Sequence, residues 1–138
     1  MNILIADANL EIRKRIEEIT KLELPEAIIV LVGDGNQALH RVIANDFDLV
    51  IISNQLRRVP GANLLQAIAR CRKQPTTLLH STKSWGYMEV APGNMQEIDL
   101  EKYAALFEFA TFKVKDAEFS YLPEFLLDFK IDRLAEGI

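Results

Sequence analysis

Asp7 and Ser53 are the two side chains that the sequence places where a site for chemistry can form. Asp7 follows the apolar run at residues 3–6, and Ser53 follows the run at 48–52. Continuous apolar runs are typical of buried parallel strands, and ligands of open α/β sheets bind where the carboxyl ends of such strands meet. For strand order 2-1-3-4-5, the first and third strands flank that crevice. We therefore expect Asp7 and Ser53 to face each other there.

The other reactive side chains stand alone. His80 has no second histidine, cysteine or carboxylate at metal-ligand spacing, so we interpret it as a structural histidine. Cys71 is the single cysteine and cannot form an internal disulfide, which favours a reducing compartment. The turn Gly33-Asp34-Gly35 lacks the third glycine of a dinucleotide fingerprint. No nucleophile is paired with a base, so the sequence predicts no enzyme, no cofactor and no metal.

The elements that position these residues alternate along the chain. Strands are predicted at residues 3–6, 27–32, 48–52, 76–79 and 111–115, each followed or preceded by an amphipathic helix. Asn9 and Asp99 are expected N-caps of the first and fourth helices. Five strands alternating with five helices predict an α/β domain with a three-layer, doubly wound, five-stranded parallel sheet. The order that we expect for it is 2-1-3-4-5, which is the flavodoxin-like arrangement.

One segment does not fit this alternation. Residues 82–97 contain Trp85-Gly86-Tyr87 and Pro92-Gly93-Asn94, and we interpret them as an atypical loop. With no repeat and no internal boundary, residues 1–138 are predicted to form a single domain.

Composition limits the classes of function. The net charge of −4 argues against a nucleic-acid surface, which needs clustered basic residues. The chain starts without a basic signal-peptide region, and no stretch approaches the roughly 20 apolar residues of a membrane span. We therefore expect a cytoplasmic protein that binds neither nucleic acid nor membranes.

In this order, the segments resemble the receiver domain of two-component response regulators. The resemblance covers nearly the whole chain apart from residues 82–97. Four stretches carry it: Ile3-Leu4-Ile5-Ala6-Asp7 with Glu11-Ile12-Arg13-Lys14, Asp34-Gly35-Asn36-Gln37-Ala38-Leu39, Phe47-Asp48-Leu49-Val50-Ile51-Ile52, and Phe112-Lys113-Val114-Lys115. Gly61 and Leu64-Leu65, which follow the third stretch, belong to the resemblance as well.

The resemblance implies a phospho-acceptor pocket, and here that pocket is degenerate. Asp7 matches one of the two acidic positions that hold magnesium in the family, but its neighbour is Ala8. The acceptor aspartate is replaced by Ser53. The phosphate-binding lysine corresponds to Lys115, and the hydroxyl position corresponds to Ser81 or, one residue earlier, to His80. Two prolines common in the family are also replaced, by Arg57 and Asp116.

These replacements predict that conventional phosphotransfer fails. One carboxylate and a neutral serine are a poor magnesium site, and serine cannot form the acyl phosphate. Asp7 and Lys115 either pair across the pocket or are solvated separately. Ser53 is expected to be a hydrogen-bonded filler rather than a modification site.

The aromatic residues suggest where contacts form. Six of the seven phenylalanines lie between positions 107 and 129, and we expect most of them to build the core. By resemblance, the face of the fourth helix, fifth strand and fifth helix carries partner contacts or self-association, and Phe112 matches its switch aromatic. Trp85 and Tyr87 are candidate contact residues, or they fold back to cap the sheet.

The sequence thus predicts a phosphorylation-independent pseudo-receiver that serves bacterial signalling as an interaction or dimerisation module. The alternative is a small-molecule sensor that uses the vacated crevice.

Overall fold

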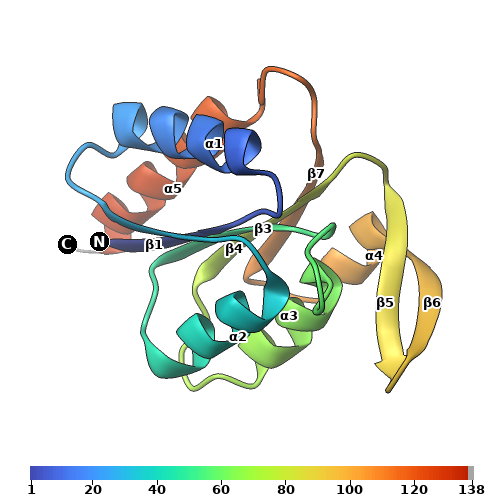
Figure 1. Ribbon diagram of the computed structural model, residues 1–138. Helices are drawn as coiled ribbons and strands as arrows, with labels where there is room; N and C mark the ends of the chain where they lie inside the picture. The colour runs from blue at the N-terminus through green and yellow to red at the C-terminus, as the bar shows by residue number, and fades with distance from the viewer. Residues whose placement is uncertain (137–138) are drawn as a thin grey trace.

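A sheet of five parallel strands, with helices on both faces, forms the centre of the molecule in a computed structural model that describes residues 1–136 (Figure 1). The strands lie in the order β2-β1-β3-β4-β7, so the predicted order 2-1-3-4-5 is confirmed with β7 as its fifth member. Their bounds are β1 Asn2–Ala6, β2 Ile28–Val32, β3 Leu49–Ser53, β4 Thr76–Ser81 and β7 Ala110–Val114. The final two residues of the predicted domain lie outside the described part of the chain.

The five predicted helices are present, and polar side chains cap three of them. Their bounds are α1 Leu10–Glu23, α2 Gly35–Ala44, α3 Gly61–Ala69, α4 Leu100–Ala104 and α5 Leu122–Glu136. The carboxamide of Asn9 accepts a hydrogen bond from the Ile12 amide, and Asp99 accepts one from the Lys102 amide, as predicted. Asp34 caps α2 in the same way. Each cap satisfies a backbone donor that the first helical turn leaves free.

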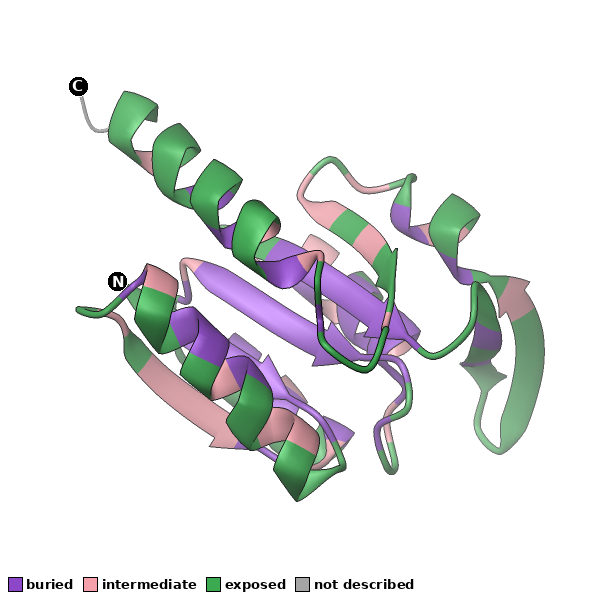
Figure 2. Cartoon of the chain, turned by 90° about the horizontal axis from the view of Figure 1, so that it is seen from above, coloured by how far each residue is buried: buried purple, intermediate pink, exposed green. Residues whose placement is uncertain are grey.

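The alternation of side chains along the strands divides the core into two layers. Leu4, Val50 and Leu79 point to the side covered by α2, α3 and α4. Ile5, Ile51 and Leu78 point to the side covered by α1 and α5. Because both faces are covered, β1 and β3 are apolar at nearly every position, and the central strands are buried along almost their whole length (Figure 2).

The prediction of a loop at residues 82–97 was wrong. Strands β5 (Trp85–Ala91) and β6 (Asn94–Asp99) form an antiparallel hairpin that lies beside α4, at the margin of the molecule (Figure 1). Pro92 and Gly93 form its turn, and Gly93 has the positive φ of +74° that glycine tolerates at this place in a turn. Proline and glycine together favour a loop, but here they form the short turn that joins two paired strands.

Candidate functional site

The carboxyl ends of the parallel strands bring three predicted site residues to one edge of the sheet. Asp7 follows β1, Ser53 ends β3, and Lys115 follows β7. Backbone hydrogen bonds continue the sheet as far as these positions: the Asp7 amide donates to Val32 O (3.2 Å), and the Lys115 amide donates to Ser81 O (2.7 Å). The site is therefore built on the rigid ends of the sheet.

The ammonium of Lys115 fills the space between the two predicted residues of the crevice. Its Nζ donates to Asp7 Oδ2 at 3.0 Å and to Ser53 Oγ at 2.8 Å. The Lys115 and Asp7 side chains are only 6% and 4% exposed. Asp7 and Lys115 thus form a buried ion pair, and the alternative of two separately solvated groups does not hold.

Further hydrogen bonds fix the acceptors of this ion pair. The other Asp7 oxygen, Oδ1, accepts from the Asn9 amide at 2.9 Å, so both carboxylate oxygens are engaged. Ser53 Oγ also accepts from the Gln55 amide at 3.2 Å, which makes it the hydrogen-bonded residue that we predicted. Arg13 donates to the backbone carbonyl of Asp7 at 2.8 Å and holds the start of α1 against the site.

His80 lies against the ion pair on the α1–α5 side of the sheet. Its Nδ1 is 3.2 Å from the Tyr121 hydroxyl, while Nε2 is 4.0 Å from Asp7 Oδ2 and has no hydrogen-bond partner among the described residues. Burial, and then the positive charge of Lys115, lower the pKa of His80 well below its usual value. Burial raises the pKa of Tyr121, with the Asp116 and Asp7 carboxylates adding to the effect. His80 and Tyr121 are therefore both neutral at pH 7.

The two candidates for the hydroxyl position have different surroundings. His80 pairs with Ser53 in the sheet and adjoins the ion pair, whereas Ser81 lines a groove in front of β3 and β5. No hydrogen bond joins the Ser81 hydroxyl to Asp7, Ser53 or Lys115 in the described structure. The sequence does not decide between His80 and Ser81, and in the structure it is His80 that lies next to the Asp7–Lys115 ion pair.

The replacements around the pocket lie at its rim. Ala8 is exposed and supplies no oxygen ligand. Arg57 contributes its backbone, whose carbonyl accepts from the Gly35 amide at 2.9 Å. Asp116 organises the turn into α5, because its carboxylate accepts from the Glu118 and Ser120 amides and from the Ser120 hydroxyl. The Ser120 hydrogen bonds lower the pKa of Asp116.

The hairpin and the loops at the strand ends enclose a groove of about 320 Å³ beside the site. Trp85 and Tyr87 line it from β5 and Met95 from β6, and the loop after β3 forms the opposite wall. The side-chain Nε2 of Gln55 donates to Thr82 Oγ1 at 2.6 Å and links that loop to the start of the hairpin segment. Trp85 and Tyr87 are 41% and 50% exposed, so they do not cap the sheet.

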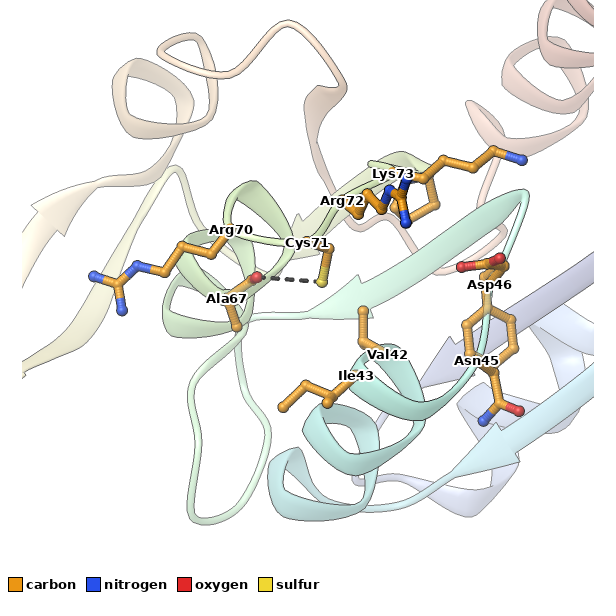
Figure 3. Close-up of a pocket in the computed structure, with 11 residues that line it drawn as sticks. Val42, Ile43, Asn45, Asp46, Ala67, Arg70, Cys71, Arg72 and Lys73 are labelled. Atoms are coloured by element: carbon orange, nitrogen blue, oxygen red, sulfur yellow. Dashed lines mark hydrogen bonds between the residues drawn. The ribbon is translucent and has the colours of Figure 1, made fainter.

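A second hollow of about 460 Å³ lies between the carboxyl ends of α2 and α3, near the amino ends of β3 and β4 (Figure 3). Cys71 reaches into it and donates to Ala67 O at 3.4 Å. It contains no residue of the predicted site. Because ligands of these sheets bind at the carboxyl ends of the strands, we assign it no part in the site.

The phenylalanines between positions 107 and 129 lie in the core or pack against it, as expected for most of them. Phe119 and Phe129 are buried with α1 and α5, and Phe112 packs partly buried against the layer that contains α4. Phe125 and Phe109 line a groove of about 500 Å³ between β7 and α5. Phe112 is thus mainly a packing residue.

Sequence reasoning missed Asn54 and Asn63. Asn54 Oδ1 accepts from the Ala62 amide at 2.8 Å, and its Nδ2 donates to Tyr87 O at 3.3 Å. Asn63 donates to Glu89 O at 2.7 Å and accepts from its amide at 2.9 Å. Both asparagines hold the hairpin to the domain. The partner of Asn54 is 33 residues away and that of Asn63 is 26 residues away, so no local signal could reveal them.

Within residues 1–136, no three or more His, Cys, Asp or Glu side chains are grouped so that they could hold a metal ion. None of the described helices is both long enough and apolar enough to cross a membrane.

No model of a known protein family matches the sequence, and no curated protein does. Solved structures do match. The response regulatory domain of mrkE from Klebsiella pneumoniae superposes with a TM-score of 0.77 at 15% identity, over 96% of this chain and 97% of that one. The chemotaxis response regulator CheY4 of Vibrio cholerae gives 0.69 at 18% identity, over 93% and 97%.

The response regulator TrrA from Thermotoga maritima, solved in complex with Mg²⁺–BeF, gives a TM-score of 0.67 at 21% identity, over 93% of this chain and 97% of that one. The fold of the chain is therefore that of the receiver domains it resembles, and the likeness extends over almost the whole length of both chains.

Proposed function

We propose that this protein is a phosphorylation-independent pseudo-receiver that acts as a protein-interaction or dimerisation module in bacterial signal transduction. One observation carries the proposal: a buried lysine ammonium binds both the remaining aspartate and the serine at the acceptor position. A receiver needs a metal and an acceptor carboxylate at this place. Here a fixed internal cation takes the place of the metal, and a hydroxyl replaces the carboxylate.

The chemistry of the pair supports a single, permanent state. A magnesium ion would have to displace the Lys115 ammonium from Asp7. In return the ion would gain no second carboxylate, because the other two receiver positions hold the methyl of Ala8 and the neutral hydroxyl of Ser53. Magnesium loses its waters reluctantly and binds through carboxylates and phosphates. Separating the ion pair would also leave a buried charge without a partner, which costs about 3–5 kcal/mol. The pocket is thus stabilised with no ligand in it.

The face formed by α4, β7 and α5 is the proposed interface. It is favoured by the position of β7 at the edge of the sheet, where no other described strand pairs with its outer side, and by the exposure of Val114. Four carboxylates line the adjoining groove at every fourth residue of α5, namely Glu124, Asp128, Asp132 and Glu136. The cytoplasm is the compartment where such signalling modules meet their partners, and the single free Cys71 suits it.

Beryllofluoride tests the proposal. It mimics an acyl phosphate only on an aspartate that shares a magnesium ion, so we expect the protein to give no saturable change in amide shifts with magnesium and beryllofluoride. The variant with Ala8→Asp and Ser53→Asp restores the missing carboxylates and is the matched control. A magnesium-dependent response of the unmodified protein, centred on Ser53, would refute the proposal.

A small-molecule sensor remains the second candidate, and the groove lined by Trp85 and Tyr87 is the observation that favours it. The crevice itself is filled by Lys115, so a ligand would have to lie beside it. Thermal-shift screening against nucleotides and metabolites separates the two functions, because a reproducible stabilisation that Tyr87→Ala abolishes would favour sensing.

A further inference from the structure

The hairpin presents one face whose side chains are both apolar and acidic. In the antiparallel register Trp85 pairs with Asp99, Tyr87 with Glu97, and Glu89 with Met95, so these six side chains lie on one face. We call them the hairpin face. Its apolar members, Trp85, Tyr87 and Met95, are 41%, 50% and 47% exposed. The opposite face of the hairpin is different: Gly86 adjoins Leu100 and Asn54, and Met88 is buried in the core.

The strand β6 pairs only with β5, so its outer edge has no neighbouring strand among the described residues. The hydrogen bonds of the β5 backbone show which amide and carbonyl groups of β6 lie along that edge. Tyr87 and Glu89 direct their backbone groups away from β6, since Asn54 and Asn63 bind them from the α3 side. Gly86 and Met88 therefore hydrogen-bond with their partners in β6. By the same alternation, Met95 and Glu97 direct their amide and carbonyl groups outward. No hydrogen bond within the described chain uses them.

The acidic side chains of the hairpin face have no cationic side chain as a partner, since none of Glu89, Glu97 and Asp99 forms an ion pair with another described residue. The Asp99 carboxylate does accept from the Lys102 amide, through which it caps α4. The nearby cation, Lys83, lies over the Trp85 ring instead, with its Nζ 4.9 Å from the ring centroid. Like charges on one face of a sheet repel, and cations on a neighbouring strand would relieve that repulsion.

We propose that the free edge of β6 binds an extended, lysine- or arginine-containing segment of a partner protein, which adds a third strand to the hairpin. Backbone groups of the segment bind Met95 and Glu97. Its alternate side chains lie on the hairpin face, where cations meet Glu97 and Asp99 and an apolar residue meets Met95. The partner's chemistry thereby specifies the interaction role proposed above, on which this inference rests.

A second copy of the chain fits the edge less well. Two β6 strands related by a twofold axis would place both sets of carboxylates on the same face, because the register gives each copy the same acidic residues there. A cationic segment instead brings charges opposite to those on the face. The rigid attachment of β5 also suits strand addition, because the edge is ordered before a partner arrives.

The acetylated and amidated peptide Thr-Lys-Thr-Lys-Thr-Val-Thr is the test ligand. Added antiparallel, it places its two lysines beside Asp99 and Glu97 and its valine beside Met95. Trp85 is the only tryptophan of the chain and lies on the same face, so its fluorescence reports binding directly. We expect a saturable change, with amide shifts concentrated at Met95 and Glu97. No saturable change up to millimolar peptide would overturn the proposal.

Two altered peptides test how the segment binds. Glutamate in place of both lysines is expected to weaken binding about tenfold or more, because attractive cross-strand pairs become repulsive ones. Methylation of the backbone nitrogens that face β6 is expected to abolish binding, since it removes the added strand's donors. Equal binding of the glutamate peptide would overturn the charge requirement, and equal binding of the methylated peptide would overturn strand addition.

Protein variants locate the site. Tyr87→Ala is expected to weaken binding about tenfold, and Glu97→Gln about two- to fivefold. Glu26→Gln, an exposed carboxylate outside the hairpin, is the control and should bind as the unmodified protein does. Unchanged binding by both hairpin variants would overturn the assignment, as would concentration-dependent broadening at Met95 and Glu97 without peptide, which indicates a second copy at the edge. These measurements use neither magnesium nor beryllofluoride, so they can fail independently of the proposed loss of phosphotransfer.

Discussion

At the scale of single residues, the site is defined by one charge pair and its neighbours. Lys115 binds Asp7 and Ser53 where a receiver would hold a metal ion. Both charges are buried, so each one is stabilised mainly by the other and by hydrogen bonds to fixed groups. The ion pair is thereby part of the buried structure that holds the strand ends together.

Removing one partner of this pair should be more harmful than removing both. Lys115→Met is expected to lower the free energy of unfolding by about 3–5 kcal/mol, because it leaves Asp7 buried without a counter-charge. Adding Asp7→Asn to that variant should restore much of the loss. Urea denaturation measures both variants, and Lys113→Met, on the exposed part of β7, is the control. A loss below about 1 kcal/mol in the single variant would show that the pair is solvated.

His80 should make stability depend on pH. Its folded-state pKa is lowered by burial and by Lys115, while Asp7 and Tyr121 also face the ring. The His80 imidazole of the unfolded state therefore binds a proton below about pH 6.5, whereas the buried imidazole of the folded state stays neutral there. Stability is fully present above this value and is lost as the pH falls from 7 to 5, with a slope approaching about 1.4 kcal/mol per pH unit.

Urea midpoints measured between pH 7.5 and 5 check this expectation. His80→Asn should flatten the profile whatever it does to absolute stability, and His40→Gln, at an exposed position of α2, is the matched control. A profile equally steep in both variants would assign the pH dependence to other groups.

At the scale of elements, the hairpin is the part that departs most from the expected alternation. Its strands bury Met88 and are attached to α3 by two asparagine side chains. A two-stranded hairpin is at best marginally stable by itself in water. These attachments therefore determine whether the edge of β6 is held in place.

Asn63→Ala should loosen the hairpin locally. It removes two hydrogen bonds to the Glu89 backbone, each contributing about 1 kcal/mol. Hydrogen exchange at hairpin amides is expected to accelerate by about one to two orders of magnitude, while the amides of β1 and β3 keep their protection. Asn36→Ala, an exposed position on α2, is the matched control. Equal acceleration in all strands would instead mean that the hairpin opens only when the whole domain unfolds.

At the scale of the whole molecule, the faces of the sheet and its edges have separate roles. Both faces are covered by helices and form the two core layers. The carboxyl edge holds the ion pair. The outer strands are β2 and β7 in the five-stranded sheet, and β6 has the outer edge of the hairpin. Acidic side chains accompany two of these edges: those of α5 lie beside β7, and those of the hairpin face lie beside β6. This acidic surface agrees with the net charge of −4 and favours cationic partners.

The sequence by itself determined the parallel sheet, the helix caps at Asn9 and Asp99, and the arrival of Asp7 and Ser53 at one edge of the sheet. These features depend on local patterns: continuous apolar runs, helical spacing, and polar residues at the ends of elements. The strand order was expected from the likeness to flavodoxin-like and receiver sheets. Asp7 and Lys115 were expected either to pair or to stay apart, because the spacing of residues cannot show whether two distant charges share a buried space.

Only the tertiary structure decided how those charges pair, that His80 rather than Ser81 adjoins them, and that residues 82–97 form a hairpin. The hairpin could not be predicted with the rest, because two strands this short gain stability from packing against other elements. Met88 packs into the core, and Asn54 and Asn63 hydrogen-bond to the β5 backbone, only after the chain has folded. Contacts between residues far apart in sequence settle these features, and no pattern of neighbouring residues records them.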